Sequence, residues 1–169
     1  MNIPVGIALG SNMGNSVQNV RQALNWLASL ACDGAIFPSS LFESTPVDCA
    51  PGTPLFVNAV CEIHLPSGAD PLILLRKLQC YEAEHGRPAE HGINQPRTID
   101  LDIIYFGDVR SNLPELIIPH PRATLRQFVL EPLAEIRPKL ILPGQKDSVA
   151  ELLAGLPDKD PRFKKILQP

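Results

Sequence analysis

Residues 96–106 read Pro-Arg-Thr-Ile-Asp-Leu-Asp-Ile-Ile-Tyr-Phe and set two carboxylates, Asp100 and Asp102, inside an otherwise apolar run. The abundance of β-branched and aromatic residues predicts a buried β-strand. Alternate residues of a strand point to the same side, so the two aspartates share one face. The apolar residues between and around them take the opposite face and anchor the strand in a core.

Two neighbouring anions on such a strand need a counter-charge. Carboxylates about 6 Å apart at an effective dielectric of ~20 repel each other by roughly 3 kcal/mol, and a bound dication reverses the sign of that energy. Magnesium takes oxygen ligands and leaves positions for water and substrate phosphates, so Asp100 and Asp102 are a candidate Mg²⁺ site. The alternative is a half-exposed strand on which Arg97 is simply an ion-pair partner.

The cysteines and histidines favour neither a zinc site nor a disulfide framework. The chain contains no Cys-x-x-Cys, and no two histidines stand four residues apart as a metal-binding helix would require. The residues concerned are Cys32, Cys49, Cys61, Cys80, His64, His85, His91 and His120.

The composition predicts a single domain. The chain has 169 residues, 44% of them hydrophobic, which suffices for one core but is cramped for two. We therefore expect one domain over residues 1–169, with a loosely held tail after residue 157. The net charge of −3 and pI near 5.8 argue against a nucleic-acid-binding surface.

No feature of the sequence suggests export or membrane insertion. The start of the chain lacks a basic leader, and no window approaches 18 apolar residues. Scattered cysteines fit a reducing compartment, so we expect a cytoplasmic protein. We expect it to be a monomer whose partners are small molecules.

The order of predicted elements indicates the fold class. Strand, helix, strand, strand, helix, strand is the order of a ferredoxin-like split βαβ sandwich, an α+β fold with helices on one face of a mostly antiparallel sheet. The predicted strands are 5–9, 35–44, 55–65, 99–106 and 116–118, and the predicted helices are 16–31, 71–85, 128–136 and 147–156, the last capped by Asp147. The loops 46–54 and 86–97 are long enough to be functional candidates.

Basic residues cluster beside the predicted aspartate strand. Guanidinium groups bind phosphates bidentately, so in a slightly acidic chain this cluster suggests a phosphate pocket. The alternative is that each is a solvated surface charge, and that the histidine among them is structural. The cluster consists of Arg87, Arg97, His120, Arg122 and Arg126.

Phe56 and Asn58 share one face of another predicted strand. An aromatic plane beside an amide could bind a flat, hydrogen-bonding ring. The alternative is a core phenylalanine next to a turn-seeking asparagine.

Several segments together resemble a known enzyme family, the 6-hydroxymethyl-7,8-dihydropterin pyrophosphokinases of folate biosynthesis. The resemblance implies the ferredoxin-like fold and a Mg-dependent diphosphokinase that moves a pyrophosphoryl group from ATP to the pterin hydroxymethyl oxygen and releases AMP. The segments are Ala8 to Asn12, Ser39-Ser40, Glu43 to Pro46, Phe56 to Ala59, Pro96 to Asp102, Ile118 to Arg122, Arg126 to Phe128 and Pro132-Leu133.

The resemblance also implies roles for individual residues. It implies two Mg²⁺ ions on Asp100 and Asp102, with Arg87 and Arg97 acting beside them as catalytic phosphate contacts. Residues implied to bind ATP are Gln79, Glu82, Arg87, Arg97, Ile103, His120 and Arg126. Residues implied to bind the pterin are Thr45, Pro46, Val47, Asp48, Phe56, Asn58, Asp100 and Phe128, with the two phenylalanines stacking on the ring.

The chain departs from the family pattern mainly in one loop. Ala89 stands where family members often have a second arginine, Asn94 where many have an aromatic residue, and Gln95 where many have glycine. These changes bear on closure of a lid and on product release, and not on metal binding. Phe56 replaces a common tyrosine, which keeps the stacking plane and removes a polar contact.

Two other functions are compatible with the same residues. A different Mg-dependent nucleotidyl- or phosphotransferase could use the paired aspartates with another acceptor. A non-catalytic pterin or nucleotide binder could keep the pocket without turnover. The products distinguish these cases. The pyrophosphokinase should release AMP, another transferase should release ADP or pyrophosphate, and a binding protein should form no product.

Overall fold

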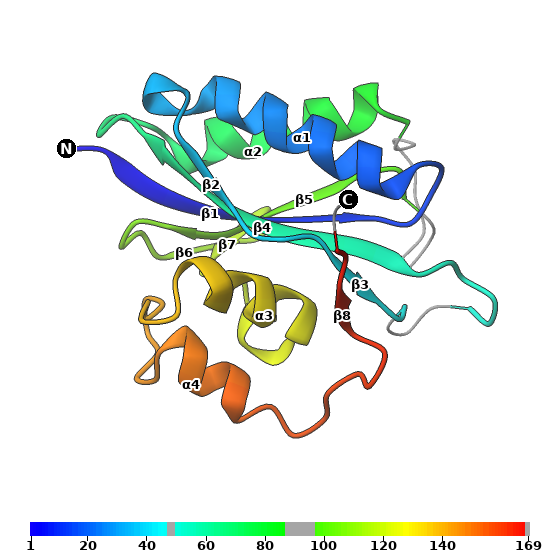
Figure 1. Cartoon of the computed structure of the whole chain (residues 1–169). Helices are drawn as coiled ribbons and strands as arrows, with labels where there is room; N and C mark the ends of the chain where they lie inside the picture. The colour runs from blue at the N-terminus through cyan, green and yellow to red at the C-terminus, as the bar shows by residue number, and fades with distance from the viewer. Residues whose placement is uncertain (47–49, 87–96, 168–169) are drawn as a thin grey trace.

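A computed structural model describes residues 1–46, 50–86 and 97–167 of the chain. Its centre is a six-stranded sheet in the order β5-β1-β4-β3-β8, with β2 also paired to β4 (Figure 1). Every pairing in this sheet is antiparallel. The strands are β1 (Ile3–Ser11), β2 (Ile36–Pro38), β3 (Phe42–Ser44), β4 (Phe56–Leu65), β5 (Asp100–Phe106) and β8 (Lys164–Lys165), and a separate hairpin joins β6 (Ser111–Leu113) to β7 (Leu116–Ile118).

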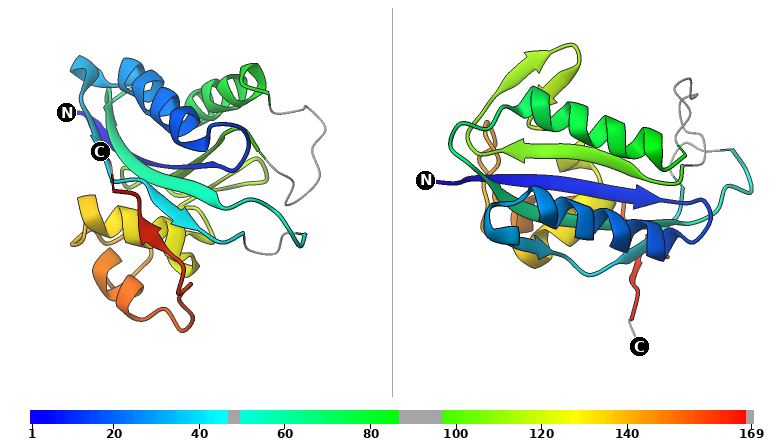
Figure 2. Two further views of the ribbon diagram at one scale, coloured as in Figure 1. Left: turned by 45° about the vertical axis from the view of Figure 1, so that its right-hand side comes forward. Right: turned by 90° about the horizontal axis from the view of Figure 1, so that it is seen from above.

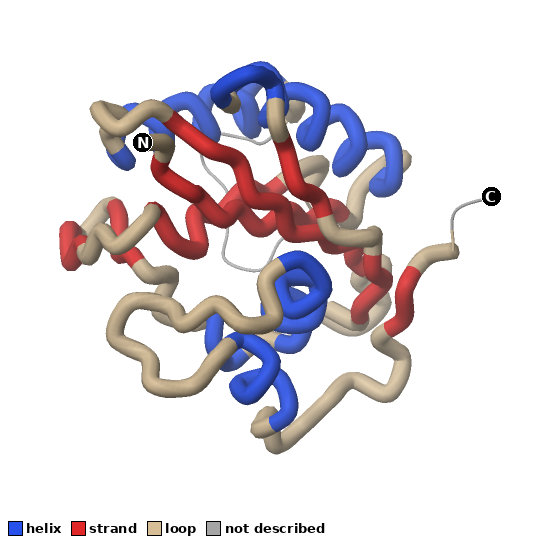
Figure 3. Tube along the Cα trace, turned by 60° about the vertical axis from the view of Figure 1, so that its left-hand side comes forward, coloured by secondary structure: helices blue, strands red, loops and turns tan. Residues whose placement is uncertain are grey.

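Helices cover both faces of the sheet. The helices α1 (Ser16–Leu30) and α2 (Pro71–Glu84) lie side by side on one face, and α3 (Gln127–Ile136) and α4 (Val149–Ala154) lie on the other (Figures 1 and 2). Figure 3 shows the strands as one twisted layer between the two helical layers. Two short 3-10 helices, Cys32–Gly34 and Ala123–Leu125, lie in the connections.

The predicted α+β fold with an antiparallel sheet is confirmed, but the prediction of helices on one face only is wrong. Helical periodicity reveals that a helix has an apolar stripe, and it does not reveal which face of a sheet receives that stripe. Each face of the sheet carries its own apolar cluster. One cluster includes Leu27 and Leu78 of α1 and α2, and the other includes Leu130 and Leu133 of α3.

The helices that cover the first face begin at residues whose side chains cap them. The Asn15 side chain accepts a hydrogen bond from Gln18 N at 3.1 Å. The Asp70 side chain accepts one from Leu72 N at 2.7 Å, and Pro71 occupies the first turn, where a missing N–H costs nothing. Both helices therefore start where the sequence predicted.

Two predicted elements differ in detail. The predicted strand 35–44 splits into β2 and β3, because the Ser39 hydroxyl rather than a backbone carbonyl accepts the hydrogen bond from Val60 N, at 3.0 Å. The last helix is capped by Ser148 and not by Asp147. Ser148 and Glu151 form a capping box in which each side chain bonds the backbone of the other, and this satisfies two of the helix's otherwise unpaired N–H groups.

The C-terminal part of the chain joins the sheet through β8. Glu43 pairs with Lys164 and Phe42 with Lys165, and Ile166 N donates a hydrogen bond to Leu41 O at 2.8 Å. The sequence did not predict this pairing. No helix within the described residues is both long and apolar enough to span a membrane.

Candidate active site

Asp100 and Asp102 lie on β5 and point toward the α3 side of the sheet. Leu101 and Ile103 belong to the apolar cluster under α1 and α2, and Ile104 belongs to the cluster under α3. Strand alternation therefore puts the two aspartates on the α3 side, where both are half-buried. The predicted pairing of the two carboxylates on one face agrees with this geometry.

Small residues of β1 form the floor beside the aspartates. Gly10 pairs with Asp100 on one side and with Asn58 of β4 on the other, and Ala8 pairs with Asp102. Two strand spacings, about 10 Å, thus separate the backbones of Asp100 and Asn58. A Cβ added at Gly10 would lie 3.5 Å from Asn58 Oδ1 and 3.8 Å from Phe56 Cδ1. Because β1 contributes almost no side chain at this point, the space next to Asn58 and Phe56 stays open.

Arg97 and Asn12 hold one end of the aspartate strand. Arg97 Nη1 donates a hydrogen bond to Asp100 Oδ2 at 2.6 Å. Arg97 N donates to Asn12 Oδ1 at 2.7 Å, and Asn12 N donates to Arg97 O at 3.0 Å. Two buried donors, Arg97 Nε and Asn12 Nδ2, have no acceptor among the residues that the structure describes. Such donors suit an anionic oxygen, because a buried unsatisfied N–H is costly.

Asn12 was not among the predicted site residues. It stands in the segment Ala8 to Asn12, which was noted only as part of a family pattern. Its link to Arg97 spans 85 positions, so no local pattern reveals it. A useful signal was the polar pair Ser11-Asn12 at the end of the apolar strand β1, and the structure buries both residues.

His120 enters the site as a neutral ring. Burial, followed by the charges of Arg126 and Arg122, lowers the pKa of His120 to about 4, and Asp100 only partly opposes this. His120 N donates to Ile104 O at 2.8 Å, which fixes the residue beside β5. His120 Nδ1 accepts from Arg122 N at 3.2 Å, so the neutral imidazole carries its proton on Nε2.

Arg126 lies within electrostatic reach of both aspartates. Burial and the charge of Arg122 lower the pKa of Arg126, while Asp102 and Asp100 raise it. Its guanidinium carbon is 5.2 Å from the centre of the Phe128 ring, a cation–π contact at the start of α3. The face therefore combines two carboxylates with basic groups and an aromatic ring.

Asn58 and Ser44 line the side of the site formed by β4 and β3. Asn58 Nδ2 donates a hydrogen bond to Ser44 Oγ at 2.7 Å, and the asparagine is only 4% exposed. Phe56 is half-buried two residues earlier on the same face. Thr45 and Pro46 follow directly after Ser44 and are also half-buried.

Three residues implied for ATP binding lie elsewhere or face another way. Gln79 is exposed on α2 and accepts a hydrogen bond from Arg76 Nη1 at 3.2 Å. Glu82 is 4% exposed, and its Oε1 accepts a hydrogen bond from Leu101 N of β5 at 2.7 Å. The Ile103 side chain is buried in the core under α1 and α2, so its contact with a nucleotide would come from the backbone.

Some predictions concern residues outside the part of the chain that the structure describes. These residues are Arg87, Val47, Asp48, Ala89, Asn94 and Gln95.

The donor set fits magnesium. Within residues 1–46, 50–86 and 97–167, no group of three or more His, Cys, Asp or Glu side chains could hold a metal ion. Proteins usually hold Mg²⁺ by one or two carboxylates, and waters and substrate phosphates complete its octahedron. Two half-buried aspartates beside basic residues therefore suit an ion that arrives with a polyphosphate better than an ion caged by protein alone.

The chain matches one family over most of its length. The family described as 7,8-dihydro-6-hydroxymethylpterin-pyrophosphokinase (HPPK) matches residues 6–138. A 2-amino-4-hydroxy-6-hydroxymethyldihydropteridine pyrophosphokinase from Pseudomonas aeruginosa is 39% identical over 153 residues, which cover 90% of this chain and 91% of that protein. The protein of the same name from Haemophilus influenzae is 36% identical over 152 residues, with coverages of 90% and 92%.

Longer proteins also contain a similar region. The folic acid synthesis protein fol1 of Pneumocystis carinii is 38% identical over 161 residues, which cover 94% of this chain and 21% of that protein. A crystal structure of wild-type Plasmodium falciparum HPPK-DHPS matches with a TM-score of 0.68 and 15% identity, and covers 91% of this chain and 44% of that chain. At this identity the structural match is one of fold.

Proposed function

Since the chain belongs to the 7,8-dihydro-6-hydroxymethylpterin-pyrophosphokinase family, we propose that the face formed by β5, β1 and β4 is where it carries out that family's reaction. The reaction transfers a pyrophosphoryl group from ATP to the hydroxymethyl group of 6-hydroxymethyl-7,8-dihydropterin and belongs to folate biosynthesis. The observation that supports this assignment most strongly is the pair of aspartates on β5 with Arg97, His120 and Arg126 around it.

Asp100 and Asp102 would hold the magnesium, with two ions expected. When bound, magnesium would neutralise the negative charge of the phosphates beside these aspartates. The half-burial of the aspartates supports this role, because excluding water strengthens every charge interaction in the site. Arg97 pairs with Asp100 and would orient its carboxylate before the substrates arrive.

The basic residues would bind the triphosphate. Arg97 Nε and Asn12 Nδ2 are buried donors for which residues 1–46, 50–86 and 97–167 offer no acceptor, and phosphate oxygens are strong acceptors. The neutral His120 can donate from Nε2 without adding a further positive charge to the two arginines nearby. The remaining proposed nucleotide contacts are Gln79, Arg87 and the backbone of Ile103. Glu82 would act indirectly, because its hydrogen bond from Leu101 N positions β5.

The pterin would lie between the two phenylalanines. Phe56 on β4 and Phe128 on α3 are both half-buried and border the same face, and stacking on aromatic rings suits a flat heterocycle. Asn58 would bind the ring edge, since its amide is held by Ser44 and cannot rotate freely. Thr45, Pro46, Val47 and Asp48 would complete recognition together with Asp100.

Product analysis tests this proposal. The protein is incubated with ATP, Mg²⁺ and 6-hydroxymethyl-7,8-dihydropterin, and the nucleotide products are separated by chromatography. AMP in equal amount to pyrophosphorylated pterin is the expected result. ADP or pyrophosphate as the product would favour another transferase, and tight binding of both substrates without turnover would favour a binding protein.

We propose a cytoplasmic, monomeric protein whose whole chain forms one domain. The join between β8 and β3 supports one domain, because it brings the last described strand into the same sheet as β1. The thiols of Cys32, Cys61 and Cys80 are not paired in disulfides, which fits a reducing compartment.

A further inference from the structure

Asp160 connects the C-terminal segment to the end of β3. Its Oδ2 accepts hydrogen bonds from Thr45 N at 2.9 Å and from Thr45 Oγ1 at 2.5 Å. The last residue of β3 that pairs with β4 is Ser44, so the Thr45 N–H is held by this carboxylate and not by the sheet. The link spans 115 positions of the chain.

The same residue is also attached to the start of α3. Asp160 N donates a hydrogen bond to Gln127 Oε1 at 2.8 Å, and Gln127 directly precedes Phe128. Asp160 thus bridges two segments that approach the proposed pterin site from different elements. Its other carboxylate oxygen, Oδ1, accepts from Arg162 N at 2.9 Å, which fixes the orientation of the carboxylate.

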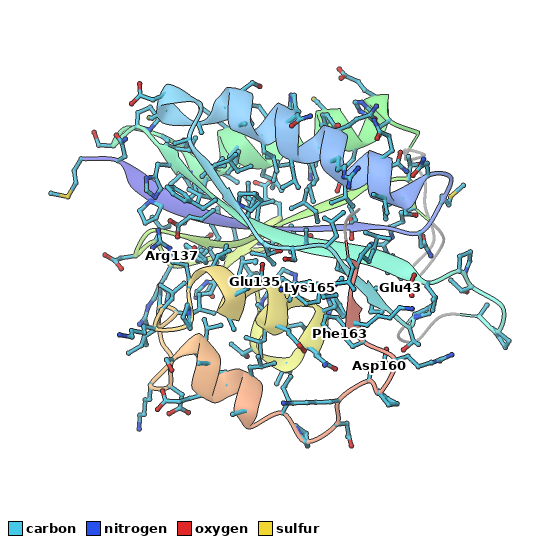
Figure 4. The ribbon with its side chains drawn as sticks, viewed as in Figure 1. Glu43, Glu135, Arg137, Asp160, Phe163 and Lys165 are labelled. Atoms are coloured by element: carbon cyan, nitrogen blue, oxygen red, sulfur yellow. The ribbon has the colours of Figure 1, made fainter. Side chains whose placement is uncertain are left out.

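Apolar and backbone contacts hold the segment that carries Asp160 in place. The Phe163 ring stacks on Phe42 of β3, with ring centres 5.2 Å apart. Ile166 N donates to Leu41 O at 2.8 Å, next to the pairing of β8 with β3. Figure 4 shows Asp160, Phe163 and Lys165 following one another along this segment beside the sheet.

Ion pairs add to these contacts on both sides. Lys164 Nζ lies 3.1 Å from Glu43 Oε1. Lys165 Nζ lies 2.9 Å from Glu135 Oε2 of α3, and Figure 4 labels both of these residues. Glu135 Oε1 also accepts a hydrogen bond from Ser40 N, at 2.7 Å. The segment is therefore tied to both β3 and α3, which are the two elements that Asp160 bridges.

We infer that Asp160 is a positioning residue for pterin binding, which acts through Thr45 and Gln127 and touches neither substrate. The inference rests on the proposed pterin site. Asp160 lies outside residues 6–138, the part of the chain that matches the family. Thr45 would otherwise have no hydrogen-bonded partner from the sheet, and ordering it only when the substrate binds would weaken that binding.

Kinetics of point variants test the inference. Asp160→Ala removes the acceptor for both Thr45 bonds, and Asp160→Asn keeps the shape but loses the charge that strengthens them. We expect the KM for hydroxymethyldihydropterin to rise about tenfold in Asp160→Ala, equivalent to about 1.4 kcal/mol, and less in Asp160→Asn. The KM for ATP and kcat should stay within about twofold of wild type. The matched control is Asp158→Asn, an exposed aspartate of the same segment.

A double-mutant cycle separates positioning from general stability. In the Thr45→Val background the hydroxyl that donates to Asp160 is absent, so Asp160→Ala should raise the pterin KM by a smaller factor than in wild type. Assays well below the melting temperature of each variant exclude a loss of folded protein, and Asp160→Asn serves if Asp160→Ala does not fold.

Each outcome of these assays has a distinct meaning. An unchanged pterin KM in both Asp160 variants, an equal rise in Asp158→Asn, or additive effects in the cycle would overturn the inference and leave the proposed function standing. A wild-type protein that makes no AMP would instead overturn the proposed function. A fall in melting temperature with unchanged kinetics would identify Asp160 as structural only.

Discussion

The buried carboxylate of Glu62 on β4 is held by Arg137, which directly follows α3. Arg137 Nε donates to Glu62 Oε2 at 2.9 Å, and Arg137 Nη2 bonds Glu62 Oε1. Tyr105 Oη donates to the same carboxylate at 2.5 Å, and His64 Nε2 lies 2.9 Å from it. Glu62 is only 2% exposed, so this cluster fastens the end of α3, at the left in Figure 4, to the central strand of the sheet.

Replacement of Glu62 should destabilise the protein. Glu62→Gln leaves donors of Arg137 and Tyr105 without their charged acceptor, and we expect the free energy of unfolding at pH 7 to fall by about 1–3 kcal/mol. Urea denaturation measures this change. The control is Glu84→Gln on the exposed face of α2, which should alter stability by less than about 0.5 kcal/mol.

The Glu62 carboxylate should also make the free energy of unfolding depend on pH in the acidic range. Burial raises the pKa of Glu62, but the hydrogen bonds from Arg137, Tyr105 and His64 more than offset this, so the pKa lies below its ordinary value of 4.5. The unfolded chain then binds the proton first, and the stabilisation present above pH 4.5 is lost as the pH falls through the folded pKa. Denaturation from pH 7 to pH 3 should show a steeper loss below pH 4.5 in wild type than in Glu62→Gln. Equal slopes would contradict the assignment.

Asp102→Asn should abolish turnover. The amide keeps the shape of the side chain but removes a negative oxygen ligand, so we expect kcat to fall at least about 10³-fold. Binding of a pterin in the absence of metal, followed by fluorescence, should change by less than about twofold because Asp102 is not among the proposed pterin contacts. Asp108→Asn, in the exposed turn after β5, is the control. Near-normal AMP formation in Asp102→Asn would count against the metal site.

Arg97→Ala should weaken catalysis and not only substrate binding. The guanidinium pairs with Asp100, and its buried Nε has no acceptor in the described part of the chain. Loss of a charge stabiliser of this kind costs about 10²–10³ in kcat. Arg97→Lys should restore only part of the activity, because a point charge cannot donate two parallel hydrogen bonds. Arg21→Ala on the exposed side of α1 is the control, and an unchanged kcat/KM in Arg97→Ala would remove this residue from the site.

Gly6→Ala should destabilise the sheet. A Cβ at this position would lie 2.1 Å from Cε1 of Tyr105, so the tyrosine ring has to move. Forced overpacking of a core typically costs about 1–3 kcal/mol, measured here by denaturation. Gly68→Ala is the matched control, since nothing lies within 4 Å of an added Cβ there. In the Tyr105→Leu background, which also lacks the hydrogen bond to Glu62, Gly6→Ala should cost less than it does in wild type. A neutral Gly6→Ala would show that the ring position is not fixed.

Local patterns of the sequence predicted the elements that carry the aspartates. The alternation around Asp100 and Asp102 fixes which residues of β5 share a face, because side chains of a strand alternate whatever its partners are. The predicted starts of α1 and α2 are also correct, because the side chains of Asn15 and Asp70 cap residues within one turn. The capping box of Ser148 and Glu151 was an available signal of this kind that the choice of Asp147 overlooked.

Contacts between distant segments were not predictable in this way. The link of Asn12 to Arg97 spans 85 positions and that of Thr45 to Asp160 spans 115, and neither leaves a periodic pattern in the sequence. The placement of α3 on the second face likewise depends on the whole sheet. The sequence therefore predicted which residues could form the site, and the fold was needed to show which of them meet.

The hydrogen bond from Leu101 N to Glu82 also protects the outer edge of β5. This strand ends the sheet, and an unpaired edge beside the proposed catalytic site is a template on which a strand from another molecule can add. The buried carboxylate of α2 occupies one of the edge donors. Intermolecular strand addition is thereby discouraged at the strand that holds Asp100 and Asp102, so resistance to aggregation and the geometry of the proposed site depend on the same helix.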